Sequence, residues 1–327
     1  MIRARAVAAL LWMQMALAPG IAQAQLNCHV GMGGINFGNV NQIGAPATTA
    51  NGSMILVCSG ARQPYVRACI ELGTPGQSSG DPRYLNGEDR AQLGYNIYKD
   101  PGYTQIWGGE FSRAGSPRAV DLPTNYGVGY TTVPYYARVP VQDDARAGMY
   151  EITFSHARDA AVRAVEFSGS PPNCSALMPT VSQFQFSVWA NVVADCVVSA
   201  STLDFGVASI VDTRRTMRAT STISLRCTSG AQYTIALDAG TASGATVADR
   251  RMARDGGTET LAYGLYSDAA RRRIWGDGSS GSETVSGTGS GTHRTENHTV
   301  YGELPLERED EPASGHYRDT ITVTVTF

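Results

Sequence analysis

The sequence predicts an all-β protein built from two antiparallel β-sandwich domains in tandem. Segments with alternating apolar and polar residues dominate the chain, and helix-like patterns are scarce. Turns rich in Gly, Ser, Pro and Asp separate these segments at the short spacing that is typical of a sandwich. An internal repeat indicates that the pattern occurs twice. The repeat is far longer than the units of solenoid proteins, so each copy is expected to have its own core.

The repeat is a set of matches at nearly constant separation. Cys28 recurs as Cys196 and Phe37-Gly38 as Phe205-Gly206, both at 196 − 28 = 168 positions. The other matches are Leu93-x-Tyr95-x-x-Tyr98-x-Asp100 with Leu261-x-Tyr263-x-x-Tyr266-x-Asp268, Ile106-Trp107-Gly108 with Ile274-Trp275-Gly276, Cys58 with Cys227, and Gly148-x-Tyr150 with Gly315-x-Tyr317. We predict a first domain over 25–180, a linker or donor-like strand over 181–195, and a second domain over 196–327.

The strands are predicted from alternation and from β-branched residues. In chain order they are SMILVCSG (53–60), YVRACIEL (65–72), LGYNIYKD (93–100), YEITFSHA (150–157), STISLRCTS (221–229), YTIALDAG (233–240), LAYGLYSD (261–268) and ITVTVTF (321–327). Trp107 and Trp275 are expected in the two cores rather than as ligand platforms, because short strands at this spacing imply a sandwich with a packed core.

The first 24 residues have the pattern of an export signal. Arg3 and Arg5 precede an apolar run from Ala6 to Ala18, and Ala22-Gln23-Ala24 matches an A-x-A cleavage site. Cleavage there predicts a mature chain that begins at Gln25. No other stretch approaches the roughly 18 apolar residues of a membrane helix, so we expect an exported, soluble protein.

Six cysteines in an exported chain indicate three disulfides. Cys28 with Cys58 and Cys196 with Cys227 occupy equivalent places in the repeat, which leaves Cys69 to pair with Cys174. Free buried thiols are the alternative. Metal binding is disfavoured because the chain has no Cys-x-x-Cys or Cys-x-x-His spacing.

Charge and motifs exclude several functions. The formal net charge is −3, and losing Arg3 and Arg5 would make the mature chain more acidic, which argues against a nucleic-acid partner. Gly76-Gln77-Ser78-Ser79-Gly80 matches a nucleophile elbow but lacks the strand-to-helix context. His293, Glu296 and His298 are expected to be solvated rather than to bind a metal. The glycines of 287–291 are expected in a flexible hairpin loop. We predict no catalytic residue, metal or cofactor.

One apolar segment before the second copy has no counterpart in the mature chain before the first. Residues 181–194 place apolar side chains on one face of an extended strand. These residues are Phe184, Phe186, Val188, Ala190 and Val192.

These motifs resemble the spore coat protein U domain, the subunit type of archaic (Csu-type) chaperone-usher pili. The resemblance rests on the cysteine pair about 30 residues apart, the FG turn, LxYxxY, IWG and the closing G-x-Y with alternating Thr and Val. It covers both halves, and the first half departs from it through Cys69, Cys174 and a longer insert after Trp107.

The resemblance implies immunoglobulin-like sandwiches that lack the last strand until a neighbouring subunit donates one. The mature chain starts almost at Cys28, so its donor-like strand is expected to complete the first domain in cis. The second domain would then accept a strand at an edge bordered by its final strand, which carries Ile321, Val323, Val325 and Phe327. Such a chain would be a two-domain tip adhesin at the cell surface. Its partners would be a periplasmic chaperone, an outer-membrane usher, the next pilus subunit, and an abiotic or host surface.

The surface-binding residues are expected on loops that are more apolar in the first copy than in the second. Tyr126, Val128 and Tyr130 are the best candidates because Gly127 and Gly129 favour a projecting turn, and exposed apolar groups mark interaction sites. Tyr103 and Tyr84 are further candidates. The alternative is that these residues fold back onto their own core. The alternative functions are an exported structural coat or pilus component without adhesive activity and, more distantly, a secreted hydrolase.

Overall fold

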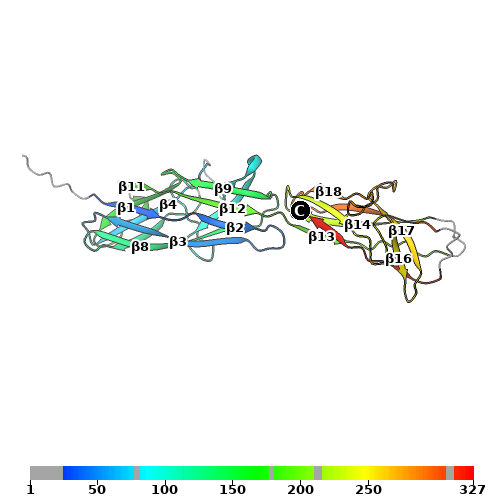
Figure 1. Ribbon diagram of the computed structural model, residues 1–327. Helices are drawn as coiled ribbons and strands as arrows, with labels where there is room; N and C mark the ends of the chain where they lie inside the picture. The colour runs from blue at the N-terminus through cyan, green and yellow to red at the C-terminus, as the bar shows by residue number, and fades with distance from the viewer. Residues whose placement is uncertain (1–24, 77–81, 113, 177–179, 210–215, 307–312) are drawn as a thin grey trace, which may run out of the picture.

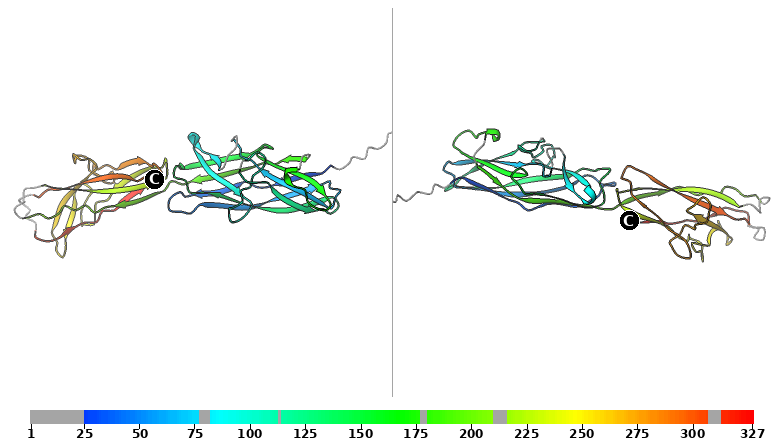
Figure 2. Two further views of the ribbon diagram at one scale, coloured as in Figure 1. Left: turned by 180° about the vertical axis from the view of Figure 1, so that it is seen from behind. Right: turned by 90° about the horizontal axis from the view of Figure 1, so that it is seen from above.

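The computed structural model describes residues 25–76, 82–112, 114–176, 180–209, 216–306 and 313–327. Two β-sandwich lobes lie end to end (Figure 1), and the same arrangement is seen from behind and from above (Figure 2). In the described residues there is no α-helix, and no helix is long and apolar enough to cross a membrane. The predicted all-β fold with two tandem sandwiches is therefore confirmed.

The first domain packs an eight-stranded sheet, ordered β1-β3-β8-β6-β5-β9-β12-β2, against a four-stranded sheet, ordered β11-β10-β4-β7. Its strands are β1 (Asn27–Gly31), β2 (Ile35–Val40), β3 (Thr48–Ser59), β4 (Tyr65–Leu72), β5 (Arg83–Asn86), β6 (Gln92–Tyr98), β7 (Arg118–Pro123), β8 (Val128–Val139), β9 (Gly148–Phe154), β10 (Ala160–Phe167), β11 (Thr180–Gln183) and β12 (Phe186–Val192). Two short 3₁₀ turns are η1 (Glu88–Arg90) and η2 (Cys174–Ala176).

The second domain repeats the plan with fewer strands. One sheet is ordered β13-β14-β19-β17-β16-β20 and the other β18-β15-β21. The strands are β13 (Cys196–Ala200), β14 (Met217–Cys227), β15 (Gln232–Leu237), β16 (Arg250–Arg254), β17 (Thr260–Tyr266), β18 (Val285–Thr288), β19 (Glu296–Leu304), β20 (Tyr317–Arg318) and β21 (Val323–Thr326). The expected flexible loop over 287–291 is wrong in part, because Gly287 lies in β18. A side chain at Gly287 would collide with Tyr233, so glycine allows β18 to pack against β15.

Three disulfides link the pairs that the repeat register predicts: Cys28–Cys58, Cys69–Cys174 and Cys196–Cys227. Cys28 lies directly opposite Cys58 in β1 and β3, and Cys196 lies opposite Cys227 in β13 and β14. The third disulfide has no counterpart in the second domain and ties β4 to η2. Each copy of the cysteine pair thus ties the first strand of its domain to the strand with which it pairs.

Each core is built around a buried tryptophan and a buried arginine. Trp107 and Trp275 donate from Nε1 to the carbonyls of Ile70 and Ile235, at 2.9 and 3.1 Å. Both tryptophans are buried, as the sequence predicted. Arg83 is also buried, and its guanidinium donates to the carbonyls of Gly73, Leu72 and Trp107. Arg250 does the same in the second domain, to the carbonyls of Asp238, Val247, Leu237 and Trp275.

Several hydrogen bonds join the two domains. Asp143 Oδ1 accepts from the His293 amide at 2.6 Å and from Thr292 Oγ1 at 3.0 Å. The Ala147 amide donates to the Ser229 carbonyl at 3.0 Å. Asn41 Nδ2 donates to Asp195 Oδ2 at 2.8 Å. The end of the first domain that carries Asn41 and Asp143 is therefore the joint end.

Candidate functional site

In the first domain, the segment that precedes the second copy fills a long groove. β12 pairs antiparallel with β9 and parallel with β2, and β11 pairs antiparallel with β10. The segment predicted as one strand or linker is thus two strands, one in each sheet, and the first domain extends to Val192 rather than to residue 180. Its inward side chains are almost fully buried: Phe184 6%, Phe186 5%, Val188 0%, Ala190 1% and Val192 1% exposed.

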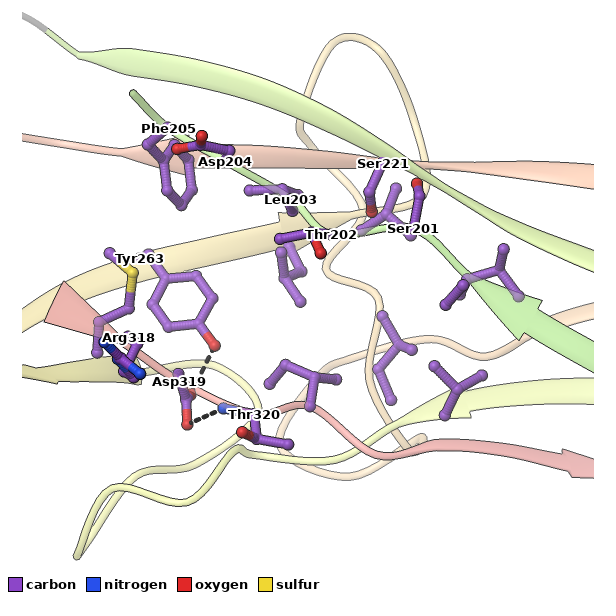
Figure 3. Close-up of a pocket in the computed structure, with 18 of the residues that line it drawn as sticks. Ser201, Thr202, Leu203, Asp204, Phe205, Ser221, Tyr263, Arg318, Asp319 and Thr320 are labelled. Atoms are coloured by element: carbon purple, nitrogen blue, oxygen red, sulfur yellow. Dashed lines mark hydrogen bonds between the residues drawn. The ribbon is translucent and has the colours of Figure 1, made fainter. Parts of the chain in front are cut away.

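The corresponding groove of the second domain, which we call the acceptor groove, lies between residues 200–205 and residues 317–323. Its volume is about 460 Å³. Leu203, Phe205, Tyr263 and Leu265 are among its lining residues, and Figure 3 shows Leu203 and Phe205 on the side opposite Asp319. Residues 203–208 correspond to β2 of the first domain by the 168-residue offset, but they form no strand. The groove has the place of the site that β12 fills in the first domain, and much of its lining is likewise apolar.

Two edges of the acceptor groove carry backbone groups without a strand neighbour on that side. Within the described part of the chain, β21 pairs only with β15, and β20 pairs only with β16. The matching strands of the first domain, β10 and β9, each pair on both sides. A sheet edge of this kind is a template for a strand from another chain.

The predicted edge residues lie along this border. Ile321 and Val323 line the acceptor groove, and both pack against the core of the second domain together with Val325. Phe327 is half exposed, at 51%. The final strand is therefore the edge strand of the smaller sheet, with its apolar side chains turned inward.

One wall of the acceptor groove is polar. Tyr263 Oη donates to Asp319 Oδ2 at 2.6 Å, and Asp319 Oδ1 accepts from the amide and the hydroxyl of Thr241, each at 2.8 Å. Burial, followed by the contact with Asp319, raises the pKa of the Tyr263 hydroxyl, which therefore remains a proton donor. Neither residue was singled out as a site from the sequence, although Tyr263 belongs to the LxYxxY repeat.

At the opposite end of the first domain, a two-residue turn projects Tyr126. Asn125 and Val128 exchange hydrogen bonds of 2.8 and 3.0 Å, with Tyr126 and Gly127 at the tip. Both tip residues have positive φ, +49° and +77°, which identifies a type I′ turn. Tyr126 is 99% exposed. Tyrosine is unusual here, because a type I′ turn favours Asn, Asp or Gly at this position.

Tyr126 lies at one end of a group of exposed apolar side chains on the outer face of the large sheet. Val128 and Tyr130 are exposed on β8, and Tyr130 lies opposite exposed Val57 of β3. We call Ile55, Val57, Tyr126, Val128 and Tyr130 the apolar patch. The expectation that Val128 and Tyr130 belong to a loop is wrong, because β8 already starts at Val128. Gly129 lies within the strand, where any side chain would meet the carbonyl of Pro123.

Ile55 and Val57 were not predicted as surface residues. The signal was present in Met54 to Val57, where four consecutive apolar residues cannot all face one core in an alternating strand. In the second domain, the register from the cysteine pair places Ser224 and Arg226 at these positions. The same register places Thr295 where the first domain has Tyr130. The apolar patch is thus a property of the first domain alone.

The apolar patch lies far from the second domain. Thr48, at the start of β3, pairs with Val139, which is four residues from Asp143 at the joint. β3 then runs for 12 residues to Ser59, opposite Val128. At about 3.3 Å per residue, Ser59 and Val128 therefore lie roughly 40 Å from Thr48 at the joint end.

Tyr103 and Tyr84 do not join the patch. Tyr103 packs edge-on against Tyr98 at 5.5 Å, with Arg138 over its ring at 5.6 Å. Tyr98 pairs with Tyr136, which is six residues along β8 from Tyr130. Tyr84 lies in β5 opposite Gly94 and is partly buried.

The remaining candidates from the sequence carry no catalytic arrangement in the described residues. Glu296 and His298 contact Tyr233 Oη at 2.6 and 2.9 Å, and His293 contributes its amide to the domain joint. Across the described ranges, no group of three His, Cys, Asp or Glu residues could hold a metal. The nucleophile-elbow match at 76–80 lies outside the described residues except for Gly76.

The fold and the groove define a class: tandem immunoglobulin-like sandwiches of which one is closed by its own strand and the other has an open edge. The family model described as "Spore Coat Protein U domain" matches residues 13–155 and 182–324. The chain belongs to this family. The second match begins within the segment that, in the structure, completes the first domain.

The chain is similar to several known proteins. The chain is similar to "Protein U" of Myxococcus xanthus, 31% identical over 182 residues, which cover 51% of this chain and 97% of that protein. Its fold is similar to a chain in the CsuC-CsuE chaperone–tip adhesion subunit pre-assembly complex of Acinetobacter baumannii. That match has 17% identity and a TM-score of 0.52, and covers 92% of this chain and 100% of the other. The CupB6 tip adhesin of Pseudomonas aeruginosa matches with 17% identity and a TM-score of 0.44, over 92% and 94% of the two chains.

Proposed function

We propose that this protein is the tip adhesin of an archaic chaperone-usher pilus. It passes through the periplasm with a chaperone, is assembled at an outer-membrane usher, and joins the fibre by accepting the donor strand of the next subunit in its acceptor groove. Its first domain attaches the cell to an abiotic or host surface and so promotes biofilm formation. The observation that carries this proposal is the contrast between a groove filled in cis in one domain and an open, equivalent groove in the other.

The first domain supplies a template for the incoming strand. By analogy with β11 and β12, the donor runs antiparallel to β20 and β21 and parallel to residues 203–205. It would satisfy the backbone groups of both edges and cover the apolar lining of the groove. Burying four or five inward side chains at about 1.5 to 3 kcal/mol each would make such a joint very durable.

The apolar patch supports the adhesive role of the first domain. It lies at the end remote from the acceptor groove, so a surface and a fibre can be bound at the same time. Tyr126 occupies a left-handed backbone conformation that costs about 1 kcal/mol or more for a non-glycine residue, and its side chain is almost fully exposed. A conformational cost without compensating contacts inside the molecule is typical of a residue that makes its contacts with a partner.

The test is a variant in which Tyr126, Val128 and Tyr130 are all replaced by serine, examined in cells that assemble the pilus. Piliation should be unchanged, and attachment to hydrophobic surfaces should fall several-fold, because many weak contacts act together on one cell. The matched control is Val141→Ser with Met149→Ser, two exposed apolar residues of the same domain outside the patch. Normal attachment of the triple variant, with normal piliation, would overturn the adhesive role of this patch.

An exported structural coat or pilus component without adhesive activity is the second candidate. The similarity to Protein U and the name of the family favour it. The same experiment separates the two functions, because a purely structural component would lose no attachment with the triple variant.

A further inference from the structure

The acceptor groove contains a carboxylate at a position where the filled groove of the first domain is apolar. Two equivalent pairs of contacts show which residues of the two domains correspond along this wall. Tyr150 and Tyr317 each donate to a carbonyl four residues earlier, and Asn86 pairs with Glu151 as Ala253 pairs with Arg318. Two residues after Tyr150 the first domain has Ile152, and two residues after Tyr317 the second has Asp319.

The filled groove identifies which donor residue meets this carboxylate. Ile152 lies directly opposite Val188 of β12, and Val188 lies beside Ile35 of β2. The counterparts in the second domain are Asp319 and Leu203, which line opposite walls of the acceptor groove (Figure 3). An incoming strand in the same register therefore places one inward side chain between Leu203 and Asp319.

Asp319 is held in place but retains capacity for one more hydrogen bond. Oδ1 accepts from the Thr241 amide, the Thr241 hydroxyl and the Thr320 amide, each at 2.8 Å. In the described part of the chain, Oδ2 accepts only from Tyr263 Oη. The three donors on Oδ1 share its two lone pairs, whereas Oδ2 uses one of its two for Tyr263, so Oδ2 can receive another donor from the groove side.

An apolar donor side chain at that point would exclude water from the carboxylate and could not donate a hydrogen bond to it. Burying a charged oxygen with one of its two lone pairs unused is costly, whereas a second hydrogen bond to that oxygen would be one of the stronger kind, because the acceptor is charged. Threonine has nearly the shape of the valine at position 188 and adds a hydroxyl. Serine and threonine therefore fit this position, and valine, leucine and phenylalanine do not.

We propose that Asp319 is a specificity-determining residue of the acceptor groove, which selects a donor strand with serine or threonine at the position that Val188 occupies in the first domain. This inference rests on the proposed acceptance of a donor strand and identifies the chemistry of that strand.

The direct test uses the mature full chain and two synthetic peptides. One has the chain's own sequence over 180–192, TVSQFQFSVWANV, and the other has threonine in place of Val188. The threonine peptide should bind about tenfold more tightly, measured by calorimetry and by the rise in unfolding temperature of the second domain. In the variant Asp319→Ile, which copies Ile152, the order of the two peptides should reverse. Equal or tighter binding of the valine peptide to the unmodified chain would overturn the inference.

A reciprocal test in the first domain does not depend on any incoming strand. Ile152→Asp should lower the unfolding temperature of the first domain by roughly 10 °C, because the carboxylate would face buried Val188. Val188→Thr alone should also destabilise the domain, and the double variant should recover a clear part of the loss. Additive losses would show that a hydroxyl at this position does not satisfy the carboxylate, and would overturn the inference.

The two tests separate this inference from the proposed function. Failure of both peptides to bind, together with recovery in the double variant of the first domain, would reject donor-strand acceptance and with it the role of Asp319. Binding of both peptides with equal affinity would leave acceptance in place and reject the selection by Asp319 alone.

Discussion

The two domains differ most in the strands that border the groove. In the first domain, β9 is seven residues long and pairs along its whole length with β12. The corresponding β20 of the second domain has two residues, and residues 203–208 form no strand although they match β2 in sequence. Phe37-Gly38 and Phe205-Gly206 are the same dipeptide in the same place. The comparison teaches that these segments become strands through a neighbour on each side rather than through their own propensity.

The largest expected effect comes from breaking the strand that closes the first domain. Val188→Asp places a charge at a site with no solvent exposure, and should cost about 4 to 5 kcal/mol or more. Calorimetry should show the loss of the unfolding transition of the first domain and an unchanged transition of the second. Gln185→Asp, at an exposed position of the same segment, is the control and should change little. Two unchanged transitions for Val188→Asp would contradict the closure in cis.

A smaller loss of stability, equal in the two domains, is expected from replacing the buried arginine that both cores share. Arg83→Met and Arg250→Met each leave several buried backbone carbonyls without their donor, at a cost of about 3 kcal/mol in the affected domain. Lysine should not restore stability, because it lacks the fork that reaches several carbonyls at once. Chemical denaturation of each variant measures the free energy of unfolding of the affected domain. A loss in only one domain would show that the arginines are not equivalent.

The smallest expected effect is a difference between the two domains in how their stability depends on pH. Burial lowers the pKa of His298 below that of a free histidine, and Tyr233 and Glu296 are the polar groups against it. The unfolded chain therefore binds the proton more readily, and the second domain should lose stability as pH falls from about 6.5 through the lowered pKa. The register of β8 and β19 places Val133 at this position in the first domain.

The matched variant for this prediction is His298→Val. Between pH 7 and 5, its second domain should unfold at a temperature that depends less on pH than that of the unmodified chain. The first domain should behave alike in both proteins and serves as the internal control. An unchanged pH dependence in His298→Val would assign the titration to another group.

Much of the fold was predictable from the sequence because the chain repeats itself. The offset of the cysteines fixed the disulfide register, and the alternation in ITVTVTF identified the final strand. The offset also placed the apolar leader between the copies, where the structure has β11 and β12. These features depend on local periodicity and on spacing, which a sequence displays directly.

The parts that were missed depend on contacts between distant segments. Alternation over 181–192 does not reveal that β11 and β12 lie in different sheets. The Ser, Thr and Gly-rich sequence around Gly287 predicts a loop, yet Gly287 lies in β18 and Tyr233 packs where its side chain would be. Asp319 could have been noted as an acidic residue just before the final strand, but its position opposite a donor residue requires the pairing of β9 with β12.

The place of β12 also has a mechanical consequence. β12 leads through residues 193–195 directly into β13, and the two lobes lie end to end (Figure 1). In the proposed assembly, a pull between the apolar patch and the fibre would be applied along β12, while the hydrogen bonds of β12 to β9 and β2 run across the direction of pull. These bonds resist in shear and must break together rather than one after another. The same strand that completes the first domain would thus hold it closed under tension.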